Sequence, residues 1–366
     1  MKAKSVFLVI LASLLVLATY SGSQAANTKD IDSVRSKGVL DSKDFQIIDG
    51  FVAEAVKELV ETSDFTSVAK LRTAIVSKSK SEQSQYAEQF STSARKYIEK
   101  GLKTASALTP ESRQFNTILN LLILIDNLEN PRLVEPAMGL LNDKNKAICY
   151  WAVHSLTNPG IIKQLNSSKT ANSKLTADIA AKLSKLVESV GPETIALMVG
   201  FAAAADVQQG DDLLLQIADM RISRYADWTV NGELLDSDIL RVLYEKISSS
   251  SMNKTAYARR FGQLYSYAMQ RYIKGKDILS TDRKEDLASV LVETEQSYIG
   301  KILGVPQTSI KRAIEQSSDA ALSQEYGKLF GDEKAAGQLA LKLNFDYGKN
   351  TDGSNRTVPL TLPELL

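Results

Sequence analysis

Apolar residues recur at helical spacing along most of the chain. From Lys43 to Leu343 they return every three or four positions, in segments separated by short polar breaks. This period is typical of helices that bury one face. One such stripe comprises Phe45, Ile48, Val52, Val56 and Leu59. No convincing run of alternating apolar and polar residues precedes residue 344, so the pattern predicts an all-α fold.

The segment Pro131–Leu156 is predicted to form two short helices around a polar turn. Asn130 can cap the first helix, and Pro131 fits a first helical turn because its missing N–H is not needed there. Asn142 and Asp143 end this helix, and Asp143 can cap the next one. Two antiparallel helices with a short connection form an αα-hairpin, which cannot bury its apolar faces alone.

This segment resembles a HEAT repeat. The matching positions are Leu133, Pro136, Leu140, Leu141, Asp143, Ile148, Ala152, Ser155 and Leu156. Cys149 departs from the pattern, because an Arg that reaches neighbouring repeats usually stands there. The specific match covers about one repeat of ~40 residues. The resemblance implies an armadillo-type α-α superhelix, at least in the first half, whose helix-lined surface binds another protein.

The N-terminal residues 1–25 have the three parts of a signal peptide. Lys2 and Lys4 form a positive end, Val6 to Ala18 is apolar, and Ser23-Gln24-Ala25 offers small residues to a signal peptidase. The apolar run is short for a membrane anchor, which needs ~20 residues. We therefore expect export, to a bacterial periplasm or envelope or otherwise by secretion.

Breaks in the helical pattern divide the rest of the chain. Residues 26–42 are polar and are predicted to be a linker. HEAT-like helices are expected over 43–165, and a polar loop over 166–173 is the best candidate for a sub-domain boundary. Further helical pairs are expected over 174–343, and an irregular tail over 344–366, partly extended and lying on the helices.

Composition narrows the class of function. The chain has 366 residues with 44 basic and 43 acidic side chains, which gives no attraction to nucleic acid. No second segment is long and apolar enough to span a membrane. Cys149 is the single cysteine, so no intramolecular disulfide can form and packing has to stabilise the protein.

Motifs for catalysis are weak throughout. On a helix, Cys149 and His154 are five residues and about 140° apart, so they do not share a face as a nucleophile and its base would. His154 is the only histidine, which excludes a histidine cluster for zinc. Ser-x-x-Lys pairs lack the partner motifs of penicillin-binding enzymes and are predicted to be surface residues. They are Ser77–Lys80, Ser93–Lys96 and Ser251–Lys254.

Two further segments could have either a structural or a binding role. The stretch from Met252 to Lys274 mixes basic and aromatic residues, which would suit a face that binds polyanions or glycans. However, an apolar stripe falls there at helical spacing, namely Tyr257, Phe261, Leu264, Ala268 and Tyr272. We expect them to be core and the Arg side chains to be solvated. Asp346, Asn350 and Asp352 are spaced wrongly for a calcium loop and are predicted to form a polar turn.

The sequence therefore predicts an exported scaffold that is not an enzyme and binds another protein. It assigns no catalytic, cofactor or metal residue, and it leaves the binding surface and the oligomeric state open. The alternative is a helical enzyme or glycan-binding protein with carboxylates in a cleft. In that case Asp211, Asp212, Asp236 and Asp238 would be the residues to examine.

Overall fold

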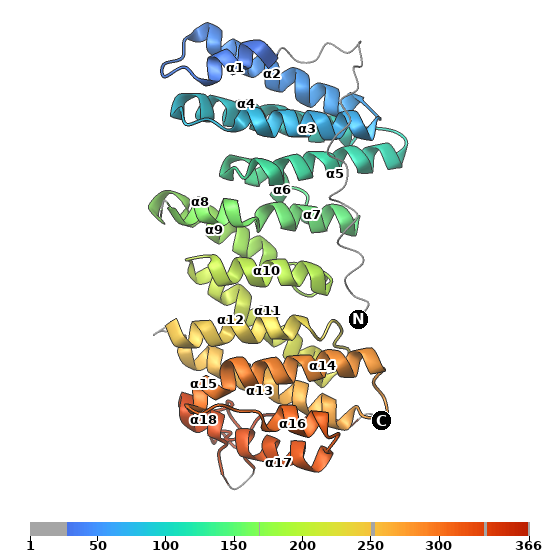
Figure 1. Ribbon diagram of the computed structural model, residues 1–366, viewed down its shortest axis with the longest axis vertical. Helices are drawn as coiled ribbons and strands as arrows, with labels where there is room; N and C mark the ends of the chain where they lie inside the picture. Colours follow the sequence, from blue (N-terminus) through green and yellow to red (C-terminus); the bar gives the residue numbers. More distant parts are fainter. Residues whose placement is uncertain (1–27, 168, 250–252, 333–334, 365–366) are drawn as a thin grey trace. The chain divides into compact units, whose positions relative to one another are not determined.

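The computed structural model describes residues 28–167, 169–249, 253–332 and 335–364. Within these ranges every regular element is a helix, and the only β-type pairings are two isolated bridges, Gly331 with Ala336 and Lys349 with Asn355. The fold is all-α, as the hydrophobic pattern predicts (Figure 1). The predicted signal peptide lies outside the described residues. Among the described helices, none has both the length and the apolar character that a membrane crossing requires.

The chain forms two compact units, residues 1–97 and 98–366, and the boundary falls within helix α4. The described helices of the first unit are α1 (Thr28–Arg35), α2 (Ser42–Glu61), α3 (Phe65–Ser79) and the first part of α4 (Ser84–Ala105). In α2 the predicted stripe is buried from Ile48 to Leu59, whereas Phe45 is half-exposed. No unit boundary falls at the polar segment 166–173.

The predicted linker over residues 26–42 is wrong for its central part, because α1 lies inside it. Ile31 and Val34 are the buried residues of this helix, at 0% and 2% exposure. Two apolar residues three positions apart give little periodicity in a polar segment, so the hydrophobic pattern did not reveal the helix. Asp41 then caps α2, accepting hydrogen bonds from the N–H groups of Lys43 and Asp44.

The second unit contains the remaining helices. They are α5 (Glu111–Leu128), η1 (Pro131–Leu133), α6 (Val134–Met138), α7 (Lys146–Leu156), α8 (Pro159–Ser167), α9 (Lys169–Ser184), α10 (Pro192–Ala204), α11 (Gln208–Ala226), α12 (Leu235–Ser249), α13 (Lys254–Lys274), α14 (Thr281–Thr294), the π-helical η2 (Glu295–Ile299), α15 (Gly300–Leu303), α16 (Ser309–Glu315), α17 (Asp319–Phe330) and α18 (Gln338–Leu343). Helix α8 reaches Ser167 and α9 begins at Lys169, so the prediction of a polar loop over 166–173 is wrong for the described residues of that segment.

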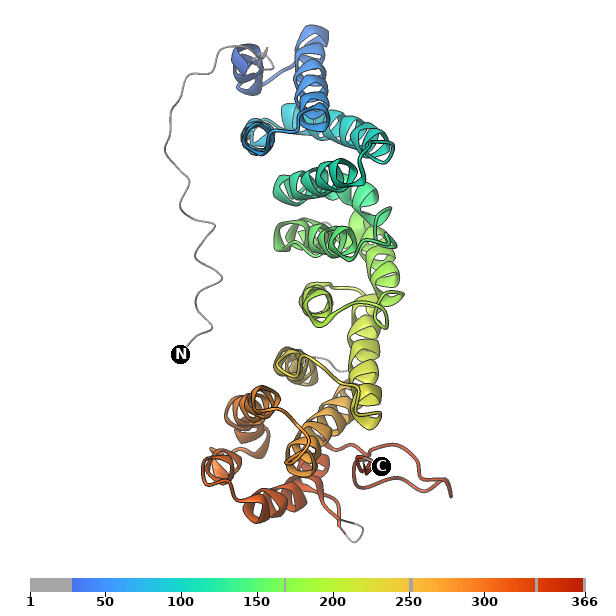
Figure 2. The same ribbon diagram turned by 90° about the vertical axis from the view of Figure 1, so that its right-hand side faces the viewer.

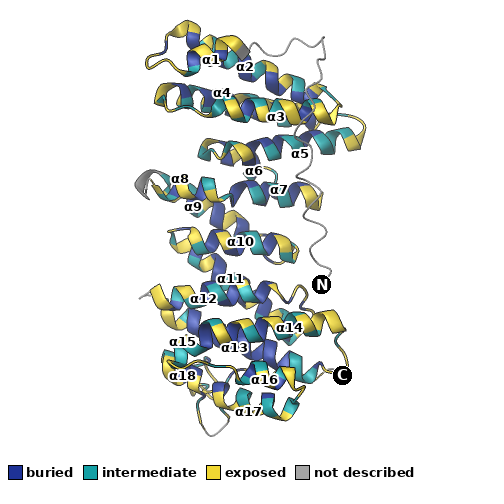
Figure 3. Cartoon of the chain, in the orientation of Figure 1, coloured by how far each residue is buried: buried dark blue, intermediate teal, exposed yellow. Residues whose placement is uncertain are grey.

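Helices of the second unit pack mainly on neighbours in sequence, in two rows. In the first row α5 packs on α7, α7 on α10, α10 on α12 and α12 on α14. In the second row α8 packs on α9, α9 on α11, α11 on α13 and α13 on α17. The two rows can be followed in Figures 1 and 2. Helix α13 of the second row is buried along most of its length (Figure 3).

The segment Pro131–Leu156 is helical at both ends, but its first helix is shorter than predicted. It begins as a 3-10 turn capped by Asn130, whose side chain accepts from the Arg132 N–H, and α6 ends at Met138. Asn145, rather than Asp143, caps α7 by accepting from the Ala147 N–H. The carboxylate of Asp143 instead accepts a hydrogen bond from the N–H of Asn145.

The chain after Leu343 is irregular, as predicted, and lies on α13. Tyr347 and Leu362 are buried, at 1% and 0% exposure. Asp346 pairs with Arg259 of α13 at 2.7 Å, and Gln263 bonds to the backbone of Leu360. The tail is therefore part of the folded second unit.

Candidate binding surface on four adjacent helices

The structure keeps Cys149 and His154 apart, as their helical spacing predicts. The Cys149 thiol is buried and donates to the Leu141 carbonyl at 3.1 Å, and burial raises its pKa. His154 is half-buried, and its Nδ1 lies 3.0 Å from Oδ1 of Asp126 on α5. This hydrogen bond raises the pKa of His154 against the opposing effect of burial. The two side chains serve separate contacts.

The four candidate carboxylates do not converge. Asp236 is fully buried, with Arg221 Nε at 2.7 Å and the Tyr225 hydroxyl at 2.7 Å. Asp238, two residues later, is exposed and pairs with Arg241 at 3.2 Å. The other two are also separately engaged, Asp211 with Lys246 and Asp212 with Gln208. Each carboxylate thus has its own partner rather than a shared cleft.

The calcium-like segment is a polar turn closed by its own side chains. Asn350 and Asp352 both bond to Ser354, while Asp346 faces Arg259. In the part of the chain that the structure describes, no group of three or more His, Cys, Asp or Glu side chains is placed to hold a metal ion.

One Ser-x-x-Lys pair is not a pair of simple surface residues. Ser93 is only 1% exposed, and both it and Lys96 contact Asp49 of α2, at 2.9 and 3.1 Å. Tyr97 also donates to Asp49. Burial opposes ionisation of Asp49, but these hydrogen bonds outweigh it and lower the pKa of the carboxyl. Ser77 and Lys80 are exposed, as predicted, and Ser251 lies outside the described residues.

Helix α13 is core, as its aromatic spacing predicts, with one exception among the arginines. Tyr257, Phe261 and Leu264 are each 0% exposed, whereas Tyr272 is half-buried. Arg271 was expected in solvent but is 1% exposed, stacked over Trp228 and placed 3.4 Å from Glu233. Contacts from the loop between α11 and α12 enclose it, which helical periodicity within α13 does not reveal.

Three partly exposed aromatic side chains lie together on α7 of the first row. Tyr150, Trp151 and His154 fall within one 100° stripe of α7, opposite its buried face. Their rings contact one another, with centroids 4.9 Å apart for Trp151 and His154 and 6.0 Å apart for Tyr150 and His154. The hydrogen bond between His154 and Asp126 orients the imidazole of this cluster.

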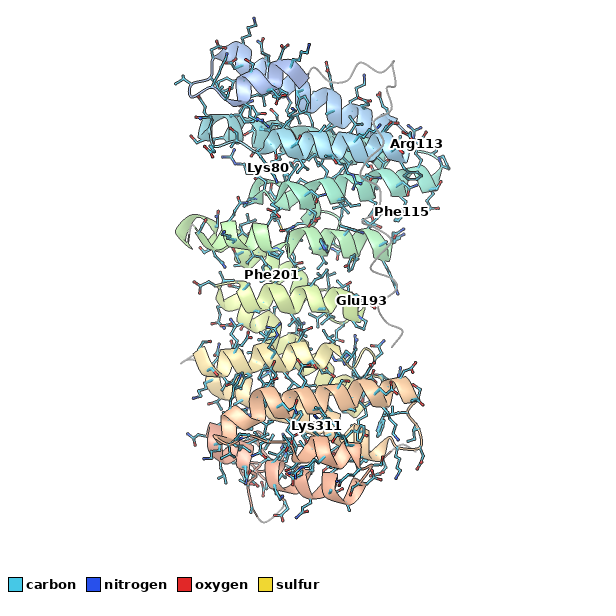
Figure 4. The ribbon with its side chains drawn as sticks, viewed as in Figure 1. Lys80, Arg113, Phe115, Glu193, Phe201 and Lys311 are labelled. Carbon is cyan, nitrogen blue, oxygen red and sulfur yellow. The ribbon has the colours of Figure 1, made fainter. Side chains whose placement is uncertain are left out.

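Small residues form the corresponding stripe of the next helix, α10. Ala196 and Ala203 are half-buried, and Gly200 is exposed, with no heavy atom within 4 Å of a Cβ placed on it. Glu193 lies in the same stripe at the start of the helix, whereas Phe201 belongs to its buried face (Figure 4). A partner could approach the α10 backbone closely here.

The stripes of α5 and α12 border this region with polar groups. On α5 the uncovered residues include Asn116, Asn120 and Ile123. On α12 they include Arg241, which bonds to Asp238 on the preceding turn and to Glu245 on the following turn, and Tyr244, over which Lys301 lies at 5.9 Å. These side chains are half-buried or exposed.

The four stripes lie on the same side of the first row. Helices α6, α8, α11 and α13 cover the other side through their contacts with α5, α7, α10 and α12. A stripe opposite the covered side of each helix therefore shares one outward direction with its neighbours. We call this surface the row face. Helical spacing places Tyr150 and Trp151 opposite the buried face of α7, but spacing alone does not tell a partly exposed aromatic face from a buried one.

Comparisons of the chain with protein-family models, with curated proteins and with solved structures found no match.

Proposed function

We propose that this protein is an exported, non-enzymatic scaffold of HEAT-like, armadillo-type helical repeats, and that it binds another protein through the row face. The observation that carries the proposal is the partly exposed aromatic cluster of α7 beside the stripe of small residues on α10. The resemblance of Pro131–Leu156 to a HEAT repeat and the packing between neighbouring helices support the repeat assignment.

The chemistry of the row face favours a protein partner. Tyr and Trp are enriched at the energetic centres of protein interfaces, because each offers a large rigid surface with one polar group. Tyr150 and Trp151 supply two such anchors, and Gly200 leaves room for a partner backbone. Arg241 with its acidic neighbours supplies a polar rim.

Site-specific photocrosslinking tests this proposal. A benzophenone amino acid is placed at Trp151 or Gly200, and at Lys163 of α8 as a control that is exposed but outside the row face. We expect the same protein partner to be captured from the first two positions and not from Lys163. Capture that is equal at Lys163, or retention on glycan without any captured protein, would contradict a row-face protein interface.

Export is tested separately from binding. The proposal expects the protein recovered from the producing cells outside the cytoplasm to begin at Ala26, because Ser23-Gln24-Ala25 presents small residues to a signal peptidase. Intact-mass measurement of the recovered protein identifies the first residue. A chain that retains Lys2 and Lys4 and stays with the cytoplasmic fraction would exclude export.

A further inference from the structure

The tail is held on α13 by side chains that bind its backbone. Gln263 accepts from the Leu360 N–H at 2.8 Å and donates to the Leu360 carbonyl at 3.3 Å. One helical repeat of seven residues later, Gln270 accepts from the Leu362 N–H at 2.6 Å and also donates to the Leu360 carbonyl. Two amides on one face of α13 therefore pair with alternate residues of an extended segment, as a neighbouring strand would.

Gln263 and Gln270, which we call the α13 clamp, are fixed in place by their surroundings. Gln263 and Gln270 are each 6% exposed. Nε2 of Gln270 also lies 2.9 Å from Ser266 Oγ and 3.0 Å from the Tyr326 hydroxyl, which sets the orientation of the amide. An occupant gives these amides backbone partners in place of water. The site is thus built to hold an extended segment.

Further groups extend the clamp toward the end of the segment. Lys274 donates to the Leu362 carbonyl at 2.8 Å, and Trp228 Nε1 donates to the Pro363 carbonyl at 2.9 Å. All these bonds go to backbone atoms, so they do not depend on the side chains of the segment. Lys274 also pairs with the carboxylate of Glu364 at 2.5 Å.

Selectivity comes from two buried side chains of the segment. Pro359 and Leu362 are buried, Leu362 completely, while Leu360 is 44% exposed and Thr361 is exposed. The motif that the clamp selects is therefore Pro-x-x-Leu. Because the backbone bonds are independent of sequence, another chain with this motif in an extended conformation fits the same groups.

We propose that the α13 clamp is a second binding site, which takes an extended Pro-x-x-Leu segment of a partner protein, and that residues 357–364 are its resident competitor. The occupied clamp defines this chemistry, and the proposal does not depend on the row face. The tail is tethered near the site through Tyr347, whose N–H donates to Arg356 O. A short tether gives an effective concentration of about 1 mM, so the tail excludes weak ligands and yields to tight or abundant ones.

A peptide-binding measurement tests the proposal. The probe is a fluorescent peptide with the sequence of residues 357–364. The protein is shortened so that it ends at Arg356, and this variant keeps the hydrogen bonds between Tyr347 and Arg356. We expect saturable binding to this shortened protein, while the full chain takes up the peptide only near millimolar concentration. A Leu362→Ser change in the peptide should weaken binding by about ten- to a hundredfold, the value of burying one leucine. Leu360→Ser should have much less effect.

Two controls keep the result interpretable. If the shortened protein does not fold by circular dichroism, the full chain carrying Leu362→Ser replaces it, because this change loosens the tail without removing it. Absence of binding to a folded variant, or equal binding of both altered peptides, would overturn the proposal. A dimer of the full chain held by exchanged tails would also overturn it, since the occupant would then be a second copy.

Discussion

Asp236 and Asp238 show how different two nearby carboxylates can be. Asp236 is 0% exposed and neutralises the buried Arg221, whereas Asp238 lies on the surface. Asp236→Ala leaves the Arg221 charge buried without its partner, so we expect it to lower the free energy of unfolding by about 3–5 kcal/mol. Asp238→Ala should change it by less than about 0.5 kcal/mol. Urea unfolding of both variants measures the difference.

This pair of variants also bears on catalysis. The sequence places both carboxylates near the start of one helix, and nothing in its spacing separates the buried residue from the exposed one. Burial depends on Arg221 and Tyr225, which come from the preceding helix. A carboxylate that served a reaction would affect activity without large loss of stability. A stable Asp236→Ala protein would therefore contradict the structural role assigned here.

The His154–Asp126 pair predicts a pH dependence of stability. The hydrogen bond that the imidazole makes to the Asp126 carboxylate raises the pKa of His154 above 6.5, so the charged imidazole is favoured in the folded state. Its stabilisation is fully present below the unfolded-state pKa and is lost as pH rises through the higher folded-state pKa. The difference in melting temperature between the natural protein and Asp126→Asn should be larger at pH 5.5 than at pH 8.5.

The matched control for this dependence is His154→Gln, which keeps a polar side chain but cannot take up the proton. In that background Asp126→Asn should shift the melting temperature by a similar amount at both pH values. Thermal unfolding of the four proteins at both pH values, followed by circular dichroism, gives the four differences in melting temperature. A pH dependence that persists without the imidazole would have to come from another group.

At the scale of elements, two glycines on neighbouring rows have opposite surroundings. A Cβ on Gly262 of α13 would lie 2.9 Å from Phe345 and 3.0 Å from the Tyr347 hydroxyl, whereas one on Gly200 of α10 would meet open space. Gly200→Ala should therefore stabilise the protein by about 0.5–1 kcal/mol through helix propensity. Gly262→Ala should destabilise it and loosen the start of the tail.

Limited proteolysis separates these two outcomes. Cleavage within the exposed turn 350–354 should become faster in Gly262→Ala and remain unchanged in Gly200→Ala. Chemical unfolding gives the accompanying change in stability. Equal protection of the turn in both variants would mean that the tail tolerates a methyl group on α13.

Helical periodicity could predict elements whose apolar stripe is long, and it failed where burial is local. The buried face of α7 follows directly from Ile148, Ala152 and Leu156. Helix α1 buries only Ile31 and Val34, and the start of α9 is polar, so neither gives a stripe. The α13 clamp could not be predicted, because it joins Gln263 to a segment 97 residues later. A polar residue on a core helix carries no sign of such a partner.

At the scale of the whole molecule, packing between sequence neighbours predicts that stability is local. When each helix contacts mainly the next ones in its row, a destabilising change should be felt most strongly by adjacent helices. The two tryptophans report on separate places, Trp151 on α7 and Trp228 in the loop after α11. Proteins that retain one tryptophan each, through Trp228→Phe or Trp151→Phe, make the two regions distinguishable by fluorescence.

Asp236→Ala introduced into both single-tryptophan proteins tests this locality. Because Arg221 and Asp236 flank the loop that carries Trp228, we expect the urea midpoint reported by Trp228 to fall more than the midpoint reported by Trp151. An all-or-none domain behaves differently, since both probes then report one transition and shift together. Coincident shifts would therefore show that the second unit unfolds as a single cooperative body and would count against the repeat architecture proposed for it.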